Sequence, residues 1–117
     1  MGPYSQAVVA TGKTLVFISG QVPEDADGNL VGKNNIVAQT QQVLKNLKAM
    51  LDETGATVSD LVKITLFLVG ISPSTYDSVA KLRNEFFGSN RPASTLVEVT
   101  RLANPDWLIE IEAFAVV

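Results

Sequence analysis

One stretch near the middle of the chain, Leu61 to Val69, most constrains how this sequence can fold. It reads LVKITLFLV, and strand side chains alternate between two faces, so both faces of a strand here would be largely apolar. The first face holds Val62, Ile64, Leu66 and Leu68; the second holds Leu61, Phe67 and Val69, interrupted by Lys63 and Thr65. Such a strand must be covered twice. Because two helices can cover one face, we expect another subunit to cover the second.

Two helices are predicted on either side of this strand. The first is capped by Asn34 or Asn35 and runs to about Thr54, where a glycine can adopt the left-handed C-cap. Its apolar stripe comprises Ile36, Val43, Leu47 and Met50, and its water-facing side comprises Gln39, Gln41, Gln42, Lys45 and Lys48. The second begins at Ser72-Pro73 and ends at Gly88, because proline is favoured at the first helical position.

The two ends of the chain predict strand pairs. Residues 6–10 and 14–19 are expected to form a hairpin. Residues 94–100 and 107–117 form two further strands, joined by a turn at residues 104–106. The order is therefore β-β-α-β-α-β-β. This order predicts an α+β fold in which a mixed sheet carries two helices on one face.

Composition limits the chemistry that the chain can perform. A length of 117 residues predicts one domain, spanning residues 1–117. The sequence has no cysteine and no histidine, which excludes disulfides, thiolate nucleophiles, Ser-His pairs and the usual zinc sites. A net charge of −3 disfavours nucleic-acid binding. No apolar run is long enough for a membrane span and no secretory signal is visible, so we expect a cytoplasmic protein. The missing histidine and cysteine ligands also lead us to expect no metal site.

Several separated motifs resemble those of one family. They are G-P-Y-S-Q-A at residues 2–7, I-S-G-Q-V-P at 18–23, P-A-S-T-L-V-E-V-T-R-L at 92–102 and I-E-I-E-A at 109–113. In this order and spacing they resemble the Rid family, also called YjgF or L-PSP. The resemblance covers nearly the whole chain. It implies a chorismate-mutase-like fold assembled as a homotrimer, with ligand clefts between neighbouring subunits. Because relatives carry a short lead-in before the first motif, a trimmed N-terminus is one interpretation of Met1.

The resemblance also implies an activity. Active Rid proteins hydrolyse reactive enamines and imines, such as 2-aminoacrylate, to a 2-oxo acid and ammonia, and they need no cofactor. Glu110 matches the glutamate that orients the attacking water, and Tyr4 matches the cleft tyrosine. Ser19 and Gly20 match the pair whose backbone lines the pocket. These residues, with Ser94 and Leu96, form the predicted site.

The sequence departs from the active pattern at the carboxylate clamp. Ser94 stands where active members carry an arginine, Ala80 stands where they carry a helix asparagine, and Leu96 replaces a smaller cleft residue. An unpaired carboxylate in a partly buried site is costly. The sequence is therefore similar to arginine-lacking Rid subgroups, with weak or altered deaminase activity. Arg83 and two other arginines, Arg91 and Arg101, are alternative sources of the missing cation.

Three functions are compatible with these observations. The first is an imine or enamine deaminase with an altered substrate. The second is a non-catalytic trimer that binds a small ligand or a protein. The third is the older family description of an endoribonuclease or translation inhibitor, which an acidic chain without histidine disfavours. Fold alone does not separate the first two.

Overall fold

A computed structural model describes residues 4–117, so Gly2 and Pro3 of the first motif lie outside the described part of the chain. The elements are β1 (Leu15–Gln21), α1 (Ile36–Thr54), a 3-10 turn (Val58–Asp60), β2 (Leu61–Val69), α2 (Pro73–Phe87), β3 (Ala93–Val99) and β4 (Ile109–Val116). They form one four-stranded sheet in the order β1-β4-β2-β3. Among the described residues, no helix has the length and apolar character needed to cross a membrane.

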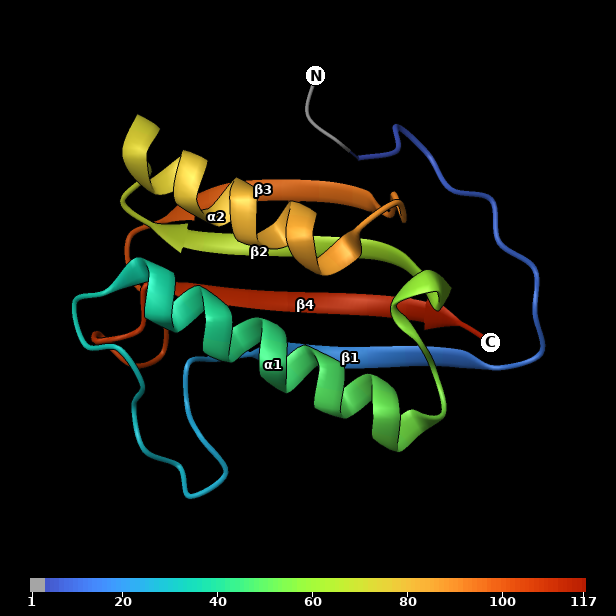
Figure 1. Cartoon of the computed structure of the whole chain (residues 1–117), viewed down its shortest axis with the longest axis horizontal. Coiled ribbons are helices and arrows are strands. Elements are labelled where there is room, and N and C mark those ends of the chain that lie inside the picture. Colours follow the sequence, from blue (N-terminus) through green and yellow to red (C-terminus); the bar gives the residue numbers. More distant parts are fainter. Residues whose placement is uncertain (1–3) are drawn as a thin grey trace.

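The sheet is mixed, and both helices cover the same face of it (Figure 1). β2 and β3 are parallel because α2 carries the chain back between them, whereas β4 is antiparallel to both β1 and β2. In the view of Figure 1, α1 crosses β1 and β4, and α2 lies over β2 and β3. The prediction of an α+β fold with two helices on one face of a mixed sheet is confirmed.

The predicted N-terminal hairpin is wrong. Residues 6–10 form no strand, and Val9 is 96% exposed. The chain before β1 instead runs to the opposite edge of the sheet (Figure 1), where Ser5 forms an isolated parallel bridge with Ala93 and its N–H donates to the carbonyl of Pro92 at 3.1 Å. An N-terminal segment tied to β3 cannot also fold back on β1. The observed order is therefore β-α-β-α-β-β.

The core lies between the helices and the covered face of the sheet. In β4, alternate residues are buried: Ile109, Ile111, Ala113 and Ala115. In β2 the buried residues are Leu61, Ile64, Leu66 and Leu68. Leu61 was expected on the opposite face from Ile64, Leu66 and Leu68, and Val62 on the same face as these three. The pairing with β4 shifts register between Leu61 and Lys63, and this irregularity turns Leu61 inward.

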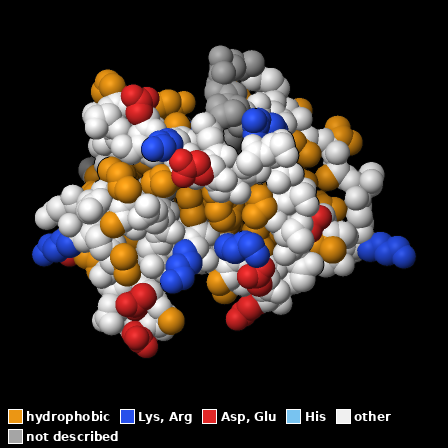
Figure 2. Space-filling view, viewed as in Figure 1, with side chains coloured by type: hydrophobic (Ala, Val, Ile, Leu, Met, Phe, Trp, Pro, Cys, Tyr) orange, Lys and Arg blue, Asp and Glu red, His pale blue; other side chains and the backbone are white. Residues whose placement is uncertain are grey.

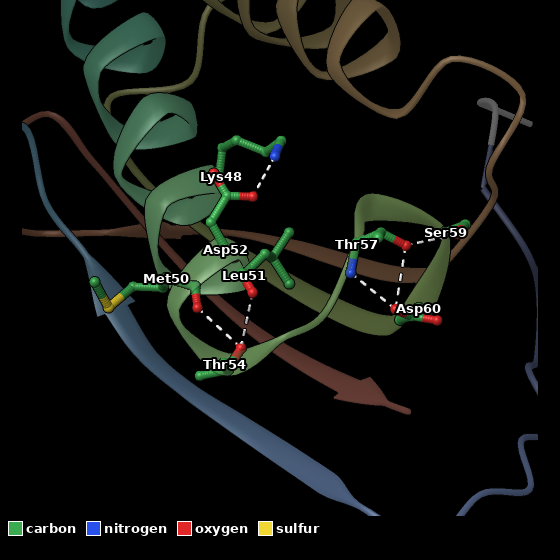
Figure 3. A network of polar contacts seen from close by, with 8 residues as sticks. All are labelled: Lys48, Met50, Leu51, Asp52, Thr54, Thr57, Ser59 and Asp60. Atoms are coloured by element: carbon green, nitrogen blue, oxygen red, sulfur yellow. Dashed lines mark hydrogen bonds and ion pairs between the residues drawn. The ribbon is translucent and has the colours of Figure 1, made fainter.

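Local hydrogen bonds define both ends of α1, and Figure 3 shows those at its C-terminal end and in the turn before β2. The Asn35 side chain caps α1 by accepting from the N–H of Ala38 at 3.0 Å, and Gly55 ends it at φ 76°. The Thr54 hydroxyl donates to the carbonyl of Met50 at 2.9 Å. One turn later, the Thr57 N–H donates to the Asp60 carboxylate at 2.8 Å, which closes the 3-10 turn before β2. The predicted caps of α1 are confirmed.

Gln39 was predicted to face water, but it is fully buried at 0% exposure. Its amide nitrogen donates to the carbonyls of Gly32 at 3.1 Å and Asp106 at 3.0 Å. Its amide oxygen accepts from the N–H of Leu108 at 2.7 Å. The side chain thus joins α1 to the loop before it and to the turn that leads into β4. A glutamine is buried here because all three backbone groups need partners.

Candidate functional site

Glu110 lies on the face of the sheet that the helices leave open. Its neighbours Ile109 and Ile111 point into the core, and Glu110 pairs across the ladder with Phe67 of β2. The carboxylate approaches β1 so closely that a Cβ at Gly20 would stand 1.8 Å from Oε2 of Glu110. Position 20 must therefore be glycine for the carboxylate to occupy this place.

A β-bulge in β1 shapes the backbone beside this carboxylate. Ile18 pairs with Ala113 and Gln21 pairs with Ile111, so the two residues between them, Ser19 and Gly20, lie at a register shift. The carbonyl of Ser19 accepts a hydrogen bond from Nε2 of Gln21 at 2.9 Å. Bulges release backbone groups from the ladder and are frequent beside active sites. Gly20 thus lies against the Glu110 carboxylate within one protomer, and Ser19 precedes it in the same bulge.

The environment of Glu110 raises the pKa of its carboxyl group. Partial burial raises the pKa of its carboxyl above the usual range, and the negative charge of Glu112, two residues along the same face, raises the pKa further. A carboxyl with a raised pKa exchanges a proton closer to neutral pH than an ordinary glutamate does. This property suits a general acid–base group.

Ser94 and Leu96 lie on the opposite face of the sheet from Glu110. β3 pairs in parallel with β2, and Ser94 aligns with Ile64 and Leu96 with Leu66, both of which are buried under the helices. Leu96 is partly buried and packs against the core cluster. Within one protomer these two side chains therefore cannot share a pocket with Glu110.

Tyr4 occupies a third place, at the outer edge of β3. Its neighbour Ser5 is bridged to Ala93, directly before Ser94, and the hydroxyl of Ser5 donates to the carbonyl of Arg91. Tyr4 itself is half-buried. The protomer thus carries Tyr4 close to the Ser94 end of β3 and away from β1.

The chain has three arginines, and they differ in what their guanidinium groups contact. Arg91 is exposed and donates to two backbone carbonyls of its own loop. Arg101 is exposed and donates to the carbonyls of the next two residues. Arg83 is only 5% exposed, and its Nη2 is buried without a hydrogen-bond partner among the described residues. Its Nε has one contact, to the Asn84 side-chain oxygen at 3.4 Å.

The helical face carries a separate groove. It lies between α1 and α2, has a volume of about 650 Å³, and has an apolar floor with charged residues around it (Figure 2). Its lining comprises Gln41, Leu44, Lys45, Lys48, Ala49, Asp52, Leu82, Glu85 and Phe86. None of these residues belongs to the predicted site. Across residues 4–117, no group of three or more acidic, histidine or cysteine side chains is placed to hold a metal ion.

Sequence reasoning missed two features of the site. It did not predict that Glu110 lies on one face of the sheet and Ser94 and Leu96 on the other. The face to which a side chain points depends on the register with the neighbouring strand. It also did not predict the bulge at Ser19-Gly20. The buried position of Arg83 had a signal, since Arg83 lies four residues from both Val79 and Phe87, which share its buried face.

Comparison with known proteins agrees with the motifs. The family model described as Endoribonuclease L-PSP matches residues 1–117. A RutC family protein of Pyrococcus abyssi is 39% identical, over 98% of this chain and 87% of the relative. A protein of Salmonella typhimurium named 2-iminobutanoate/2-iminopropanoate deaminase is 37% identical, over 99% of this chain and 88% of the relative.

Solved structures show the same fold. A Rid-family protein of Yersinia pestis, described as of unknown function, superposes with a TM-score of 0.92 at 38% identity, covering 98% of this chain and 87% of that chain. RidA of an Antarctic Psychrobacter bacterium superposes with a TM-score of 0.79 at 29% identity, covering 99% of this chain and 89% of that chain. On the whole-length family match, the identities and these superpositions, the chain belongs to the Rid family, also called YjgF or L-PSP.

Proposed function

We propose that this protein hydrolyses reactive imines or enamines to carbonyl compounds and ammonia, with Glu110 as the acid–base group. The observation that carries the proposal is the half-buried Glu110 carboxyl, which lies against the bulge at Gly20 with its pKa raised. The relative of Salmonella typhimurium named as an imine deaminase supports the same reaction class at 37% identity.

The proposed chemistry uses Glu110 for two proton transfers and forms no covalent intermediate with the protein. The ionised Glu110 carboxylate accepts a proton from a water molecule as the water oxygen bonds to the carbon of the protonated imine. This step gives a neutral carbinolamine. The protonated carboxyl then returns its proton to the amine nitrogen, and the C–N bond breaks as the C=O bond forms. The hydroxyl proton passes to the departing ammonia, which leaves as ammonium. Glu110 ends the cycle ionised, as it began.

We also propose that the complete site forms between subunits of a homotrimer. Glu110 and Gly20 lie on the open face of the sheet, whereas Ser94 and Leu96 lie on the helical face of β3. Residues on opposite faces of one sheet can share a cleft only when two copies each contribute one half. The open face also exposes large apolar side chains, including Phe17 at 72% and Leu15 at 63%. Such a surface is typical of an interface.

The substitution at position 94 affects the substrate range in this proposal. Serine supplies no charge to a substrate carboxylate, so the chain is assigned to an arginine-lacking subgroup with weak or altered activity toward 2-aminoacrylate. Arginine is the side chain best suited to bind a carboxylate, because its planar group donates two parallel hydrogen bonds.

A non-catalytic binding trimer is the second candidate. The residues that favour it are Ser94, Ala80 and Leu96, which together remove polar groups from one half of the cleft. An endoribonuclease is less well supported, because the chain has no histidine and a net charge of −3.

Ammonia release separates the two main candidates. Purified protein is supplied with several imines that are generated in the assay from amino acids, and ammonia is measured against the uncatalysed rate. The wild type should accelerate release for at least one imine. Glu110→Gln should lower kcat/KM by about a hundredfold, the scale of a lost acid–base group, while Glu85→Gln on α2 should leave it unchanged. If the wild type binds imine analogues but releases no ammonia above background, the binding trimer is the better account.

A further inference from the structure

We propose that Arg83 of α2 is the cation that binds the ligand carboxylate in this protein, in place of the arginine that is absent at position 94. The proposal rests on the proposed function, because it assigns a charge partner for the acid group of the same substrate. In active relatives the cation is expected on the strand that corresponds to β3, whereas here it would come from the helix α2. The expected ligand class is a short 2-imino or 2-oxo acid.

The position of Arg83 is the first support. The buried residues of α2 are Val79, Arg83 and Phe87, so Arg83 faces the sheet. α2 lies over β2 and β3 (Figure 1), and Ser94 points to the same side of β3. The helix starts where the parallel strands end, and Arg83 lies about 15 Å along it at about 1.5 Å per residue. Since strands advance about 3.3 Å per residue, this point is level with residues 94–96.

The direction of the side chain is the second support. Helix side chains tilt toward the N-terminus of their helix, so the Arg83 side chain lies over the preceding turn, which contains Ala80. Ala80 has a small side chain where active relatives are expected to carry asparagine. Ala80 and Ser94 are both smaller than the residues that active relatives are expected to carry at these two positions. The small residues at positions 80 and 94 and the buried Arg83 are all consistent with a cation that has moved from the strand to the helix.

The unpaired charge is the third support. Arg83 is 5% exposed, its Nη2 has no hydrogen-bond partner, and no ion pair joins it to a carboxylate within residues 4–117. A buried guanidinium without a counter-ion is strongly unfavourable. The other two arginines have backbone carbonyl partners, as described above. Of the three arginines, Arg83 is the one whose guanidinium has a buried nitrogen without a partner among the described residues, and an incoming carboxylate would satisfy it.

Binding of a stable acid and its uncharged ester tests the proposal without requiring turnover. The probes are 2-oxobutanoate and methyl 2-oxobutanoate, measured by titration calorimetry. Wild type should bind the acid at least about tenfold more tightly than the ester, the scale of a charge-assisted hydrogen bond. Arg83→Met keeps the apolar stem and should reduce this preference to less than about twofold. Arg101→Met, which removes an exposed arginine, should keep the full preference.

Two more variants make the result independent of a folding failure. Arg83→Lys keeps the charge but loses the planar fork, so its preference should be intermediate. Arg83→Met combined with Ser94→Arg moves the cation from the helix to the strand and should restore a preference for the acid. Circular dichroism confirms that each variant is folded before titration.

Three results would overturn the assignment. The first is that Arg83→Met still prefers the acid to the ester. The second is that the wild type binds the acid and the ester equally well. The third is that Arg83→Met keeps its acid preference per subunit but no longer assembles in sedimentation. The last result would mean that Arg83 pairs with a carboxylate of a second copy. A wild type that prefers the acid through Arg83 but releases no ammonia would refute the proposed hydrolysis and leave the Arg83 assignment standing.

Discussion

The carboxylate of Glu110 and the α-carbon of Gly20 are in direct contact across β1 and β4. A Cβ added at Gly20 would stand 1.8 Å from Oε2 and 2.6 Å from Cδ of Glu110. Both distances are far below van der Waals contact, so no larger residue fits at position 20 while Glu110 keeps its conformation. The backbone of Gly20 does not have a positive φ angle, so the requirement for glycine here is one of space.

Gly20→Ala should displace the Glu110 side chain and reduce the proposed activity. We expect a loss of at least about tenfold in kcat/KM, since a misplaced catalytic group commonly costs that much or more. Gly28→Ala is the control, because a Cβ added at Gly28 would have nothing within 4 Å. Unlike Gly20, Gly28 has a positive φ of 80°, which an alanine adopts at a cost in stability. That control should lose some stability but no activity. Equal activities for Gly20→Ala and wild type would show that Glu110 is not positioned through this contact.

Glu112→Gln should shift the pH dependence of catalysis. Glu112 raises the pKa of Glu110, although burial is the larger cause. The proposed base must be ionised, so kcat/KM rises with pH through the Glu110 pKa. Removing the neighbouring charge should move this rise to lower pH without abolishing activity. A pH–rate profile measures the shift, and Glu53→Gln on the exposed side of α1 should leave the profile unchanged.

The same pKa change predicts a pH-dependent stability. The folded state raises the Glu110 pKa above its ordinary value of 4.5, so folding favours the protonated carboxyl. This contribution is fully present below pH 4.5 and is lost as the pH rises through the raised pKa. Glu110→Gln cannot ionise, so its unfolding free energy should increase relative to wild type as the pH rises above that range. Urea denaturation at several pH values tests this, and a difference that is constant with pH would contradict it.

Phe17→Lys should weaken the proposed trimer. Phe17 is 72% exposed on the open face and contacts Phe114 edge to face, with ring centroids 5.4 Å apart. A charge at this position would have to be desolvated in an interface. Sedimentation at micromolar concentration should show trimers for wild type and smaller species for the variant. Val9→Lys, at a position that is 96% exposed and outside the sheet, is the control and should sediment as wild type does. A monomeric wild type would refute the assembly.

Gln39→Leu should destabilise the fold without touching the site. The substitution removes three hydrogen bonds and leaves the backbone groups of Gly32, Asp106 and Leu108 without those partners. Net costs of about 1 kcal/mol for each bond, with a further penalty for buried unpaired groups, give a loss of roughly 3–5 kcal/mol. Urea denaturation measures it. Gln41→Leu on the exposed side of α1 should change stability by less than about 0.5 kcal/mol.

Local sequence patterns determined most of the secondary structure. Asn35, Gly55 and Ser72-Pro73 mark the helix ends because caps depend on neighbouring backbone groups. The alternation in residues 109–116 separates the two faces of β4, because an unbroken strand keeps its period of two, and the structure buries one of these faces. Composition alone excluded whole classes of chemistry, because the chain has neither cysteine nor histidine.

Only the tertiary structure decided where these elements meet. Residues 6–10 have a strand-like pattern but remain outside the sheet, because Ser5 joins β3 at the far edge. Leu61 turned inward because a register shift depends on the partner strand. Ser94 and Glu110 lie on opposite faces because the register of the sheet sets Ser94 beside Ile64 and Glu110 beside Phe67 of β2. Each outcome depends on hydrogen bonds between distant segments, and a sequence period describes one segment at a time.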